Sequence, residues 1–363
     1  MACKCYTQKM RFTLLIPDLL PPQPPGGMLD LYHGLHVPDL EWLFARGALQ
    51  GNLGMSLEAW LLKHFGLEGT MPVASFSLLA ERVAYPPGYG GTPDAAYWLR
   101  ADPVHLQAQR DQLSLVDGAM LAITATEASA LTESLNQHFA QDKLHFIPAH
   151  PTRWYLALDA APTLMTHPLP AVAGKSINAC LPSGADGLRW NQIATEIQML
   201  LHAHPVNLAR EEQGQPTINS VWFWGGGICP SLDSLATPEE QIWANDALAR
   251  GLALAAKLTP QALPLNFDAF MAQANTAGAH FVLWDELRRA AWYGDHGAWR
   301  MGLMRLEADW IKPLCYALRR GIVSEVTLHA ISEQGCLAVT TNRSGRWQFW
   351  RRAKALKHYL SGT

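Results

Sequence analysis

The segment YWLRADPVHLQAQRD, residues 97–111, gathers ionisable side chains directly after a Tyr-Trp pair. It contains Arg100, Asp102, His105 and Arg110. An Asp–His pair can transfer protons or ligate a metal, whereas arginine side chains hold anionic ligands. An ordinary polar turn can have the same composition. The local spacing therefore leaves a metal site, an acid–base pair, an anion site and a turn open.

Two further acids follow apolar runs that have the pattern of buried strands. Asp18 lies near the end of FTLLIPDLL (12–20), and Asp285 follows HFVLW (280–284). In a parallel sheet the carboxyl ends of neighbouring strands lie at one edge, which is where ligands bind. We therefore expect both carboxylates at this edge, where they can act together.

An Asp–His dipeptide, Asp295–His296, lies in the glycine-flanked segment YGDHGAW (293–299). A tight turn can present both side chains to one metal ion, and both are suitable ligands. The same dipeptide is also common in turns that bind nothing, so a metal role stays one of two interpretations.

The segment HAHPVNLAREEQG (202–214) places His202 and His204 two residues apart. Two such histidines can ligate a metal, but Pro205 interrupts the helix just after them, so a polar cluster at a helix end is an equal alternative. Arg210 is followed by two glutamates, which predicts a solvated face.

Ser56 begins the amphipathic segment SLEAWLLKHFG (56–66). The positive end of a helix dipole stabilises an anion, so a serine there can act as a nucleophile. Serine is also a preferred N-cap, and on local grounds the N-cap is the stronger interpretation.

Apolar periodicity predicts alternating strands and helices, hence an α/β fold with a mainly parallel sheet flanked by helices. We expect strands over 12–20, 153–159 and 218–227, and helices over 37–47, 56–66, 127–141 and 190–204. The WGGG run (224–227) lacks a G-x-G-x-x-G continuation and predicts a turn where backbone approaches another segment closely.

The residues between about 97 and 216 interrupt the alternation of strands and helices. We therefore expect a core formed by residues 1–96 and 217–363, with an inserted domain of residues 97–216.

Composition excludes several classes of partner. The chain has 28 Lys and Arg against 31 Asp and Glu, a net charge of −3, so nothing general favours nucleic acid or an anionic membrane. No apolar run approaches the length of a membrane-spanning helix. The six cysteines are scattered without a C-x-x-C pair, which indicates a reducing cytoplasm. Met10 is an alternative start to Met1.

Taken in order, several segments resemble the cofactor-independent (2,3-bisphosphoglycerate-independent) phosphoglycerate mutases of the archaeal type, members of the alkaline phosphatase superfamily. The resemblance runs from about residue 11 to about residue 330. It rests on LLIPDLLP, VPDLEWLFARG, GMSLEAWLLKHFG, WLRADPVHL, FVLWDELRRAAWYGDHGAW and, most specifically, HPVNLAREEQGQPTINSVWFWGGG.

The resemblance implies an alkaline phosphatase-like core with an inserted α+β domain, and a site for interconverting 3- and 2-phosphoglycerate. Two divalent metals (Mn, Zn or Mg) would activate the serine nucleophile and clamp the transferring phosphoryl group. The nucleophile maps to Ser56. The implied metal ligands are Asp18, Asp285, Asp295, His296 and His329. The implied substrate-binding residues are Arg100, Asp102, His105, Arg110, His204, Asn207 and Arg210, with Arg100 on the phosphate.

The sequence departs from the family pattern at the implied metal site. The position of the family's histidine after Asp285 is Arg289, the aspartate after the nucleophile is Leu57, and of a late ligand pair only His329 is present. Trp224 replaces a family arginine. These departures predict an incomplete metal-ligand set.

Three functions remain open from the sequence. The first is a mutase-like phosphotransferase or phosphohydrolase, and the second is a regulatory or sensor relative that binds a small phosphorylated acid without turnover. The third is a structural, partner-binding protein, which the 14 tryptophans keep open because aromatic residues favour interfaces as well as cores. The sequence makes no prediction of oligomeric state.

Overall fold

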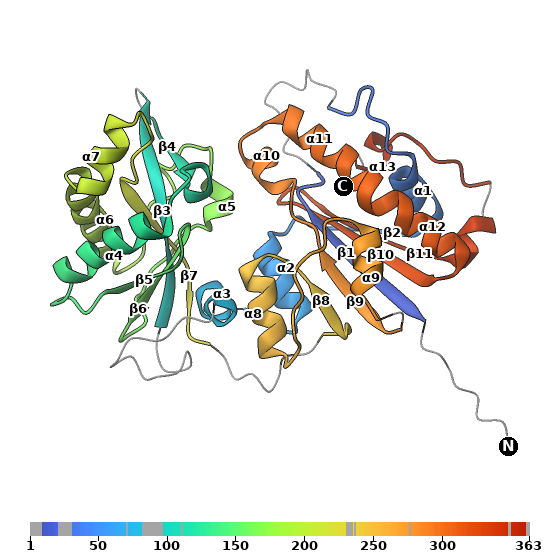
Figure 1. Cartoon of the computed structure of the whole chain (residues 1–363), viewed down its shortest axis with the longest axis horizontal. Helices are drawn as coiled ribbons and strands as arrows, with labels where there is room; N and C mark the ends of the chain where they lie inside the picture. Colours follow the sequence, from blue (N-terminus) through green and yellow to red (C-terminus); the bar gives the residue numbers. More distant parts are fainter. Residues whose placement is uncertain are drawn as a thin grey trace. The chain divides into compact units, whose positions relative to one another are not determined.

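A computed structural model describes residues 9–20, 31–69, 72–81, 97–109, 112–229, 235, 237–275, 277–347 and 350–360. The chain divides into two compact units, one formed by residues 1–66 with 235–363 and the other by residues 67–234. Figure 1 shows the elements of each unit. In the part of the chain that is described, no helix is long and apolar enough to cross a membrane.

The first unit is built on a six-stranded sheet with the order β2-β11-β10-β1-β9-β8. Its strands are β1 (Met10–Pro17), β2 (Ala48–Asn52), β8 (Gln241–Trp243), β9 (Ala279–Leu283), β10 (Val323–Ile331) and β11 (Cys336–Asn342). Four neighbours, β10, β1, β9 and β8, are parallel, and β11 and β2 pair antiparallel at one edge. The predicted mainly parallel sheet with β1 at its centre is confirmed.

Helices cover both faces of this sheet (Figure 1). Even-numbered β1 residues such as Phe12 and Leu14 belong to a large apolar core that includes residues of α1, α9, α11 and α12. On the opposite face, Trp60 of α2 packs against Phe281 of β9. The helices are α1 (Pro38–Arg46), α2 (Leu57–His64), α8 (Ala247–Ala255), α9 (Phe267–Gln273), α10 (Arg288–Trp292), α11 (His296–Leu306), α12 (Lys312–Arg320) and α13 (Lys357–Leu360).

The second unit has a five-stranded antiparallel sheet. Its strands are β3 (Tyr97–Gln109), β4 (Gln112–Asp117), β5 (His145–His150), β6 (Arg153–Leu158) and β7 (Ser220–Gly227). One face packs against α3 (Val73–Glu81), and the other against α4 (Ala125–His138) and α6 (Gly187–His202). Two further helices are α5 (Leu169–Val172) and α7 (Pro205–Glu212).

The division of the chain differs from the predicted boundaries at residues 97 and 216. Strand β7 pairs with β3 from Val104↔Ser220 to Trp98↔Gly227, and α3 packs on the same sheet. Both elements therefore belong to the second unit, whereas the sequence placed them in the core. The local sequence pattern of a strand followed by glycines is the same whichever sheet the strand joins. The assignment of β7 to the second unit therefore depends on its pairing with β3, which the pattern does not reveal.

The glycine run after Trp224 belongs to β7 and does not form the predicted turn, but it allows the close approach that the sequence predicted. A Cβ on Gly226 would lie 2.4 Å from the Tyr97 hydroxyl, and one on Gly227 would lie 2.6 Å from Pro72 Cβ. The Ser75 hydroxyl donates a hydrogen bond to the Gly227 carbonyl at 2.7 Å. The run thus lets α3 seat directly on β7.

Gly54 has a comparable role beside the turn between β10 and β11. A Cβ at this position would lie 1.9 Å from the backbone oxygen of Glu333, and the neighbouring Met55 N–H donates to Ser332 O at 2.8 Å. We expect Gly54→Ala to lower the free energy of unfolding by about 1–3 kcal/mol, because backbone must move to admit the methyl group. Urea denaturation measures the change.

The control for this substitution is Gly297→Ala in α11, where an added Cβ meets only Asp295 Oδ1 at 3.4 Å. Because Gly297 is the second residue of α11, alanine there should leave stability unchanged or raise it by less than about 1 kcal/mol. Equal losses in the two variants would contradict the proposed steric role of Gly54.

Candidate functional site

Three aspartates follow parallel strands of the first unit. Asp18 comes directly after β1, Asp285 comes after β9, and Asp246 comes after β8. Because the carboxyl ends of these strands share one edge of the sheet, the fold gathers the three carboxylates there. Asp18 and Asp285 were expected at this edge. Asp246 was not, although it also follows a short apolar run.

Arg288, the first residue of α10, is the electrostatic partner of this group, and its side chain is 12% exposed. Its Nη2 donates to Glu58 Oε1 at 2.9 Å, and its Nε lies 3.8 Å from Asp18 Oδ2. Burial opposes the charge of Arg288, but Glu58, Asp18, Asp246 and Asp285 together raise its pKa. The positive charge of one guanidinium therefore interacts with four carboxylates. Its central carbon also lies 4.9 Å from the centre of the Trp292 ring.

The positive charge of Arg288 does not fully offset the burial and mutual repulsion of these carboxylates. Burial raises the pKa of Asp18 to about 6, with Glu58 adding to the rise and Arg288 opposing it. Burial, followed by the neighbouring Asp246, raises the pKa of Asp285 to about 6. At neutral pH this edge of the sheet is thus an anionic environment that holds more negative than positive charge.

Ser56 is the N-cap of α2, as the local interpretation predicted. Its Oγ accepts a hydrogen bond from the Ala59 N–H at 3.2 Å. The hydroxyl itself donates to no residue in the described segments, so its proton is available to a ligand. Ser56 stands two residues before Glu58 and therefore lies at the same end of the sheet as the carboxylates.

The residues of this unit do not fit a two-metal centre. Within the described ranges, no group of three or more His, Cys, Asp or Glu side chains could hold a metal ion. Asp295 is an exposed N-cap of α11 that accepts from the Ala298 N–H, and His296 is the first residue of that helix. His329 packs against Trp60, and burial, aided by His64, lowers its pKa to about 4.

The expected cation substitution involves a different arginine. The sequence placed Arg289 at the position of the family's histidine. In the structure Arg289 is exposed, and it is the neighbouring Arg288 that contacts Asp18 and Glu58. The helix α10 begins at Arg288, so its first side chain points back toward the sheet edge.

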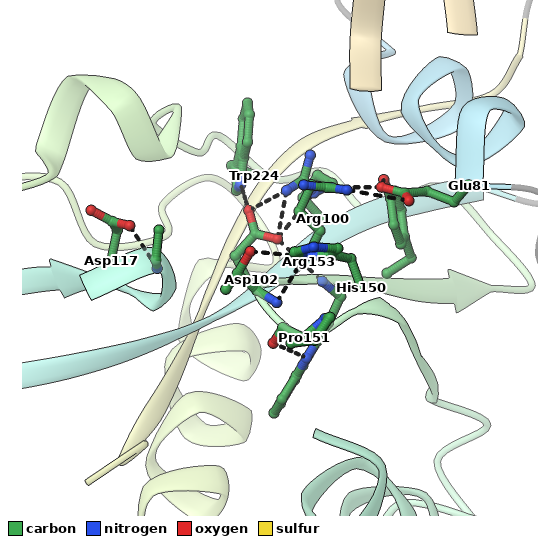
Figure 2. A network of polar contacts seen from close by, with 12 residues as sticks. Glu81, Arg100, Asp102, Asp117, His150, Pro151, Arg153 and Trp224 are labelled. Atoms are coloured by element: carbon green, nitrogen blue, oxygen red, sulfur yellow. Dashed lines mark hydrogen bonds and ion pairs between the residues drawn. The ribbon is translucent and has the colours of Figure 1, made fainter. Parts of the chain in front are cut away.

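In the second unit, Arg100 and Asp102 form a buried ion pair on β3 (Figure 2). The Nε and Nη2 atoms of Arg100 donate to Asp102 at 2.8–3.0 Å. Asp102 also accepts from Trp224 Nε1 at 2.7 Å and from the Trp154 N–H at 3.2 Å. The guanidinium packs 5.1 Å from the ring centres of Tyr155 and Trp224. Asp102 therefore orients Arg100, and Nη1 makes no hydrogen bond to any described residue.

A second arginine lies in the same network (Figure 2). Arg153 Nε donates to Glu81 Oε1 at 2.6 Å, and the Tyr155 hydroxyl donates to the same oxygen at 3.3 Å. Burial, followed by Arg153 and Arg100, lowers the pKa of His150, which is therefore neutral at pH 7. The sequence did not single out Arg153, Glu81 or His150, because no motif links them to Arg100.

Three residues expected to bind substrate have internal partners instead. His204 caps α7 through the Val206 N–H and contacts Ser134 Oγ at 3.0 Å. Asn207 is fully buried, donates to the carbonyls of Leu201 and Ile218, and accepts from the Ile218 N–H.

Arg210 does not lie on the solvated face that the two glutamates suggested. It is 3% exposed, pairs with Glu127 Oε1 at 2.8 Å and donates to the carbonyls of Pro216 and Leu121. Arg210 thus joins α7 to α4 and to the loop before β7.

The other residues of the opening segment are separated from Arg100. His105 Nδ1 lies 2.9 Å from the Thr217 carbonyl, next to the hydrogen bonds that tie Leu106 to Asn219. Arg110 lies outside the described residues. Among the described ionisable residues of this segment, Arg100 and Asp102 share one polar network and His105 lies outside it.

The raised pKa of Asp285 predicts a pH dependence of stability. Because its folded-state pKa of about 6 exceeds the ordinary 3.8, its contribution is fully present below about pH 4 and is lost as pH rises through 6. Asp285→Asn should therefore raise the free energy of unfolding at pH 7, by up to about 3 kcal/mol, and change little at pH 4. Urea denaturation at the two pH values measures both.

The control is Asp295→Asn, since asparagine caps a helix about as well as aspartate. It should unfold like the wild type at both pH values. A destabilised Asp285→Asn variant at pH 7 would show that the charge on Asp285 is needed in the folded state.

Comparison with known proteins gives relatives over part of the chain. A scan against models of protein families gives no match. The chain is 36% identical over 113 residues to a 2,3-bisphosphoglycerate-independent phosphoglycerate mutase from Methanosarcina barkeri, and 29% identical over 145 residues to a probable one from Geobacter sulfurreducens. The matches cover 30% and 40% of this chain and span only 28% and 36% of the relatives.

Solved structures match a larger share of the chain. The PH0037 protein from Pyrococcus horikoshii has a TM-score of 0.53 at 13% identity, covering 93% of this chain and 88% of that one. A cofactor-independent phosphoglycerate mutase from Thermoplasma acidophilum has a TM-score of 0.48 at 14% identity, covering 98% and 95%. The chain therefore shares the PH0037 fold, and the expected resemblance is confirmed by homologues named 2,3-bisphosphoglycerate-independent phosphoglycerate mutase.

Proposed function

We propose that this protein is a phosphoglycerate mutase-like protein that binds a small phosphorylated acid without metal-dependent turnover. The observation that carries the proposal is the placement of the Arg288 guanidinium against Asp18 and Glu58. In a metal-activated reaction this edge of the sheet would present its carboxylates to divalent cations. Here a side chain of the protein supplies the positive charge.

Charge balance supports a non-catalytic role for Ser56. Arg288 contacts Asp18 and Glu58, and Asp246 and Asp285 add further negative charge, so a phosphoryl group approaching this edge meets net negative charge. Without a metal, the Ser56 hydroxyl lacks the activation, and the transferring oxygens lack the charge neutralisation, that a divalent cation supplies. Phosphoryl transfer to Ser56 is therefore disfavoured both at the nucleophile and at the phosphate.

Anion binding in this proposal falls to Arg100 in the second unit. Asp102 holds two of its nitrogens, which fixes the guanidinium plane and leaves Nη1 for a ligand oxygen. The side chain is 8% exposed, and its guanidinium carbon lies 5.1 Å from the centres of the Tyr155 and Trp224 rings, so a ligand oxygen at Nη1 would bind a largely desolvated donor. Such a partly desolvated donor suits a carboxylate or phosphate oxygen.

The alternative is an active mutase that forms a phosphoserine on Ser56. It is favoured by the Ser56 hydroxyl, which stands at the positive end of α2 with its proton available. The names of the homologous proteins favour it as well.

Metal analysis and a mutase assay separate the two proposals. We expect purified protein to contain less than about 0.1 divalent metal per chain, because Arg288 supplies the charge that a metal would bring. The conversion of 3-phosphoglycerate to 2-phosphoglycerate should be equally absent in wild type and Ser56→Ala. Stoichiometric metal together with turnover that Ser56→Ala abolishes would establish the mutase instead.

Calorimetric titration with 3-phosphoglycerate tests the role of Arg100. Arg100→Lys keeps the charge but loses the planar fork that Asp102 orients, so we expect affinity to fall about tenfold or more. The control is Arg189→Lys, whose side chain is 62% exposed in the same unit and should bind like the wild type.

Circular dichroism checks that both variants are folded. Unchanged affinity in Arg100→Lys would remove Arg100 from the site. Absence of binding by the wild type to any small phosphorylated acid would favour a partner-binding protein.

A further inference from the structure

Residues 343–358 carry a local positive charge that the overall composition conceals. They contain six of the 28 Lys and Arg residues of the chain and no Asp or Glu. Without these six, the chain has 22 basic against 31 acidic residues. The net charge of −3 is therefore an average over an acidic protein and one strongly basic segment, and this segment suits a polyanionic partner.

The basic segment is held against the first unit by its backbone and its apolar side chains. The Leu356 N–H donates to Glu41 Oε1 of α1 at 3.0 Å, and Leu356 itself is 1% exposed. Tyr359 of α13 stacks on Phe44 of α1 with the ring centres 5.4 Å apart, and Figure 1 shows these two helices side by side. These contacts fix the segment on α1 without using its charged side chains.

The segment meets the ends of α12 and α1, which makes one continuous surface. In η4 (Arg343–Trp347), Arg343 lies beside the end of α12, since a Cβ on Gly321 would be 3.1 Å from its Nη1. Arg351 Nη1 donates to the carbonyl of Gly47, just after α1, at 3.3 Å. We call this surface the basic face and define it by its exposed members Arg320, Arg343, Arg351, Arg352, Lys354 and Lys357.

Nearby acids do not neutralise the basic face. Within the described part of the chain, no acid forms an ion pair with Arg320, Arg343, Arg351, Arg352 or Lys354. Asp39 of α1 is already paired with Arg319 at 2.7 Å. Arg46, the last residue of α1, adds buried Nε and Nη1 atoms without a hydrogen-bond partner among the described residues. The charge of this face is therefore available to an external anion.

Large apolar side chains are exposed among these charges. Trp347 is 63% exposed and Trp350 is 67% exposed, and Ile322, just after α12, is 48% exposed. Tryptophan is favoured where lipid tails meet charged headgroups because its ring is amphipathic, and Arg and Lys bind the lipid phosphates. An exposed isoleucine gains nothing from a phosphate backbone, so the combination fits an anionic lipid surface better than a nucleic acid.

We propose that the basic face docks the protein on the surface of an anionic phospholipid membrane. Trp347 and Trp350 lie at the level of the headgroups in this arrangement, and the arginine and lysine side chains of the basic face bind lipid phosphates. The proposal concerns the first unit alone and does not depend on whether phosphoglycerate binds.

Co-sedimentation with vesicles tests the requirement for charge. We expect wild type to bind vesicles of phosphatidylcholine with about 30% phosphatidylglycerol, and to bind pure phosphatidylcholine at least about tenfold more weakly. Raising NaCl from about 0.1 M to about 0.5 M should release the protein from the anionic vesicles, because salt screens exposed charges. The double variant Arg352→Gln, Lys354→Gln should bind these vesicles about tenfold more weakly or worse, since each basic residue near such a surface contributes about fivefold.

Matched variants separate this face from the rest of the surface. Lys63→Gln with Lys257→Gln removes the same charge from two exposed positions of the first unit outside the basic face, and should bind like the wild type. Trp350→Ala should weaken binding about fivefold while the salt dependence stays, because the charges remain and one interfacial ring is lost. Its control is Leu265→Ala, which removes a side chain that is 91% exposed elsewhere in the unit. Thermal unfolding checks that all four variants are folded.

Three results would overturn the proposal. One is a wild type that sediments equally with neutral and anionic vesicles, or with neither. Another is unchanged binding by the folded Arg352→Gln, Lys354→Gln variant. The third is tighter binding to duplex DNA than to anionic vesicles, or release from the vesicles by millimolar glycerol phosphate, since the face would then be a site for nucleic acid or for free phosphate.

Discussion

The structure of the first unit depends on one electrostatic constraint. A parallel sheet brings the residues after its strands to one edge, and here those residues include Asp18, Asp246 and Asp285. Such a cluster, together with Glu58, is stable in a folded chain only if a cation lies among the carboxylates or if some of them are protonated. In this protein Arg288 contacts two of the acids, and the pKa values of Asp18 and Asp285 still rise to about 6, so protonation adds to the compensation only when the pH falls through about 6.

The second unit places an arginine in a different relation to its acid. Arg100 and Asp102 form a nearly closed pair, with two guanidinium nitrogens donating to one carboxylate that Trp224 and Trp154 also satisfy. Charge is balanced there, and one nitrogen is left over. At Arg288 the acids outnumber the base, and a carboxylate oxygen is left over. The first arrangement leaves a hydrogen-bond donor without a partner among the described residues, whereas the second leaves an acceptor without one.

The sequence predicted most of what hydrophobic periodicity can encode. The buried run ending at Asp18, the helix that Ser56 caps and the mainly parallel sheet are confirmed. It did not predict Arg288, because a choice between positions 288 and 289 depends on where a five-residue helix begins. It also missed Asp246, which is the N-cap of α8. Asp246 also raises the pKa of Asp285, because the strand order places β8 beside β9, and no local sequence pattern reveals that order.

The most specific stretch of the family resemblance builds structure in this chain. His204 caps a helix, Asn207 bonds to Leu201 and Ile218, and Arg210 spans from α7 to the start of α4. Any protein that folds its second unit in this way needs these hydrogen bonds, whether or not it catalyses a reaction, because each buried polar group requires a partner. Similarity in this stretch is therefore a measure of shared fold. In the proposed function, the residues that distinguish a binding protein from a mutase are those at the sheet edge of the first unit, where Arg288 contacts Asp18 and Glu58.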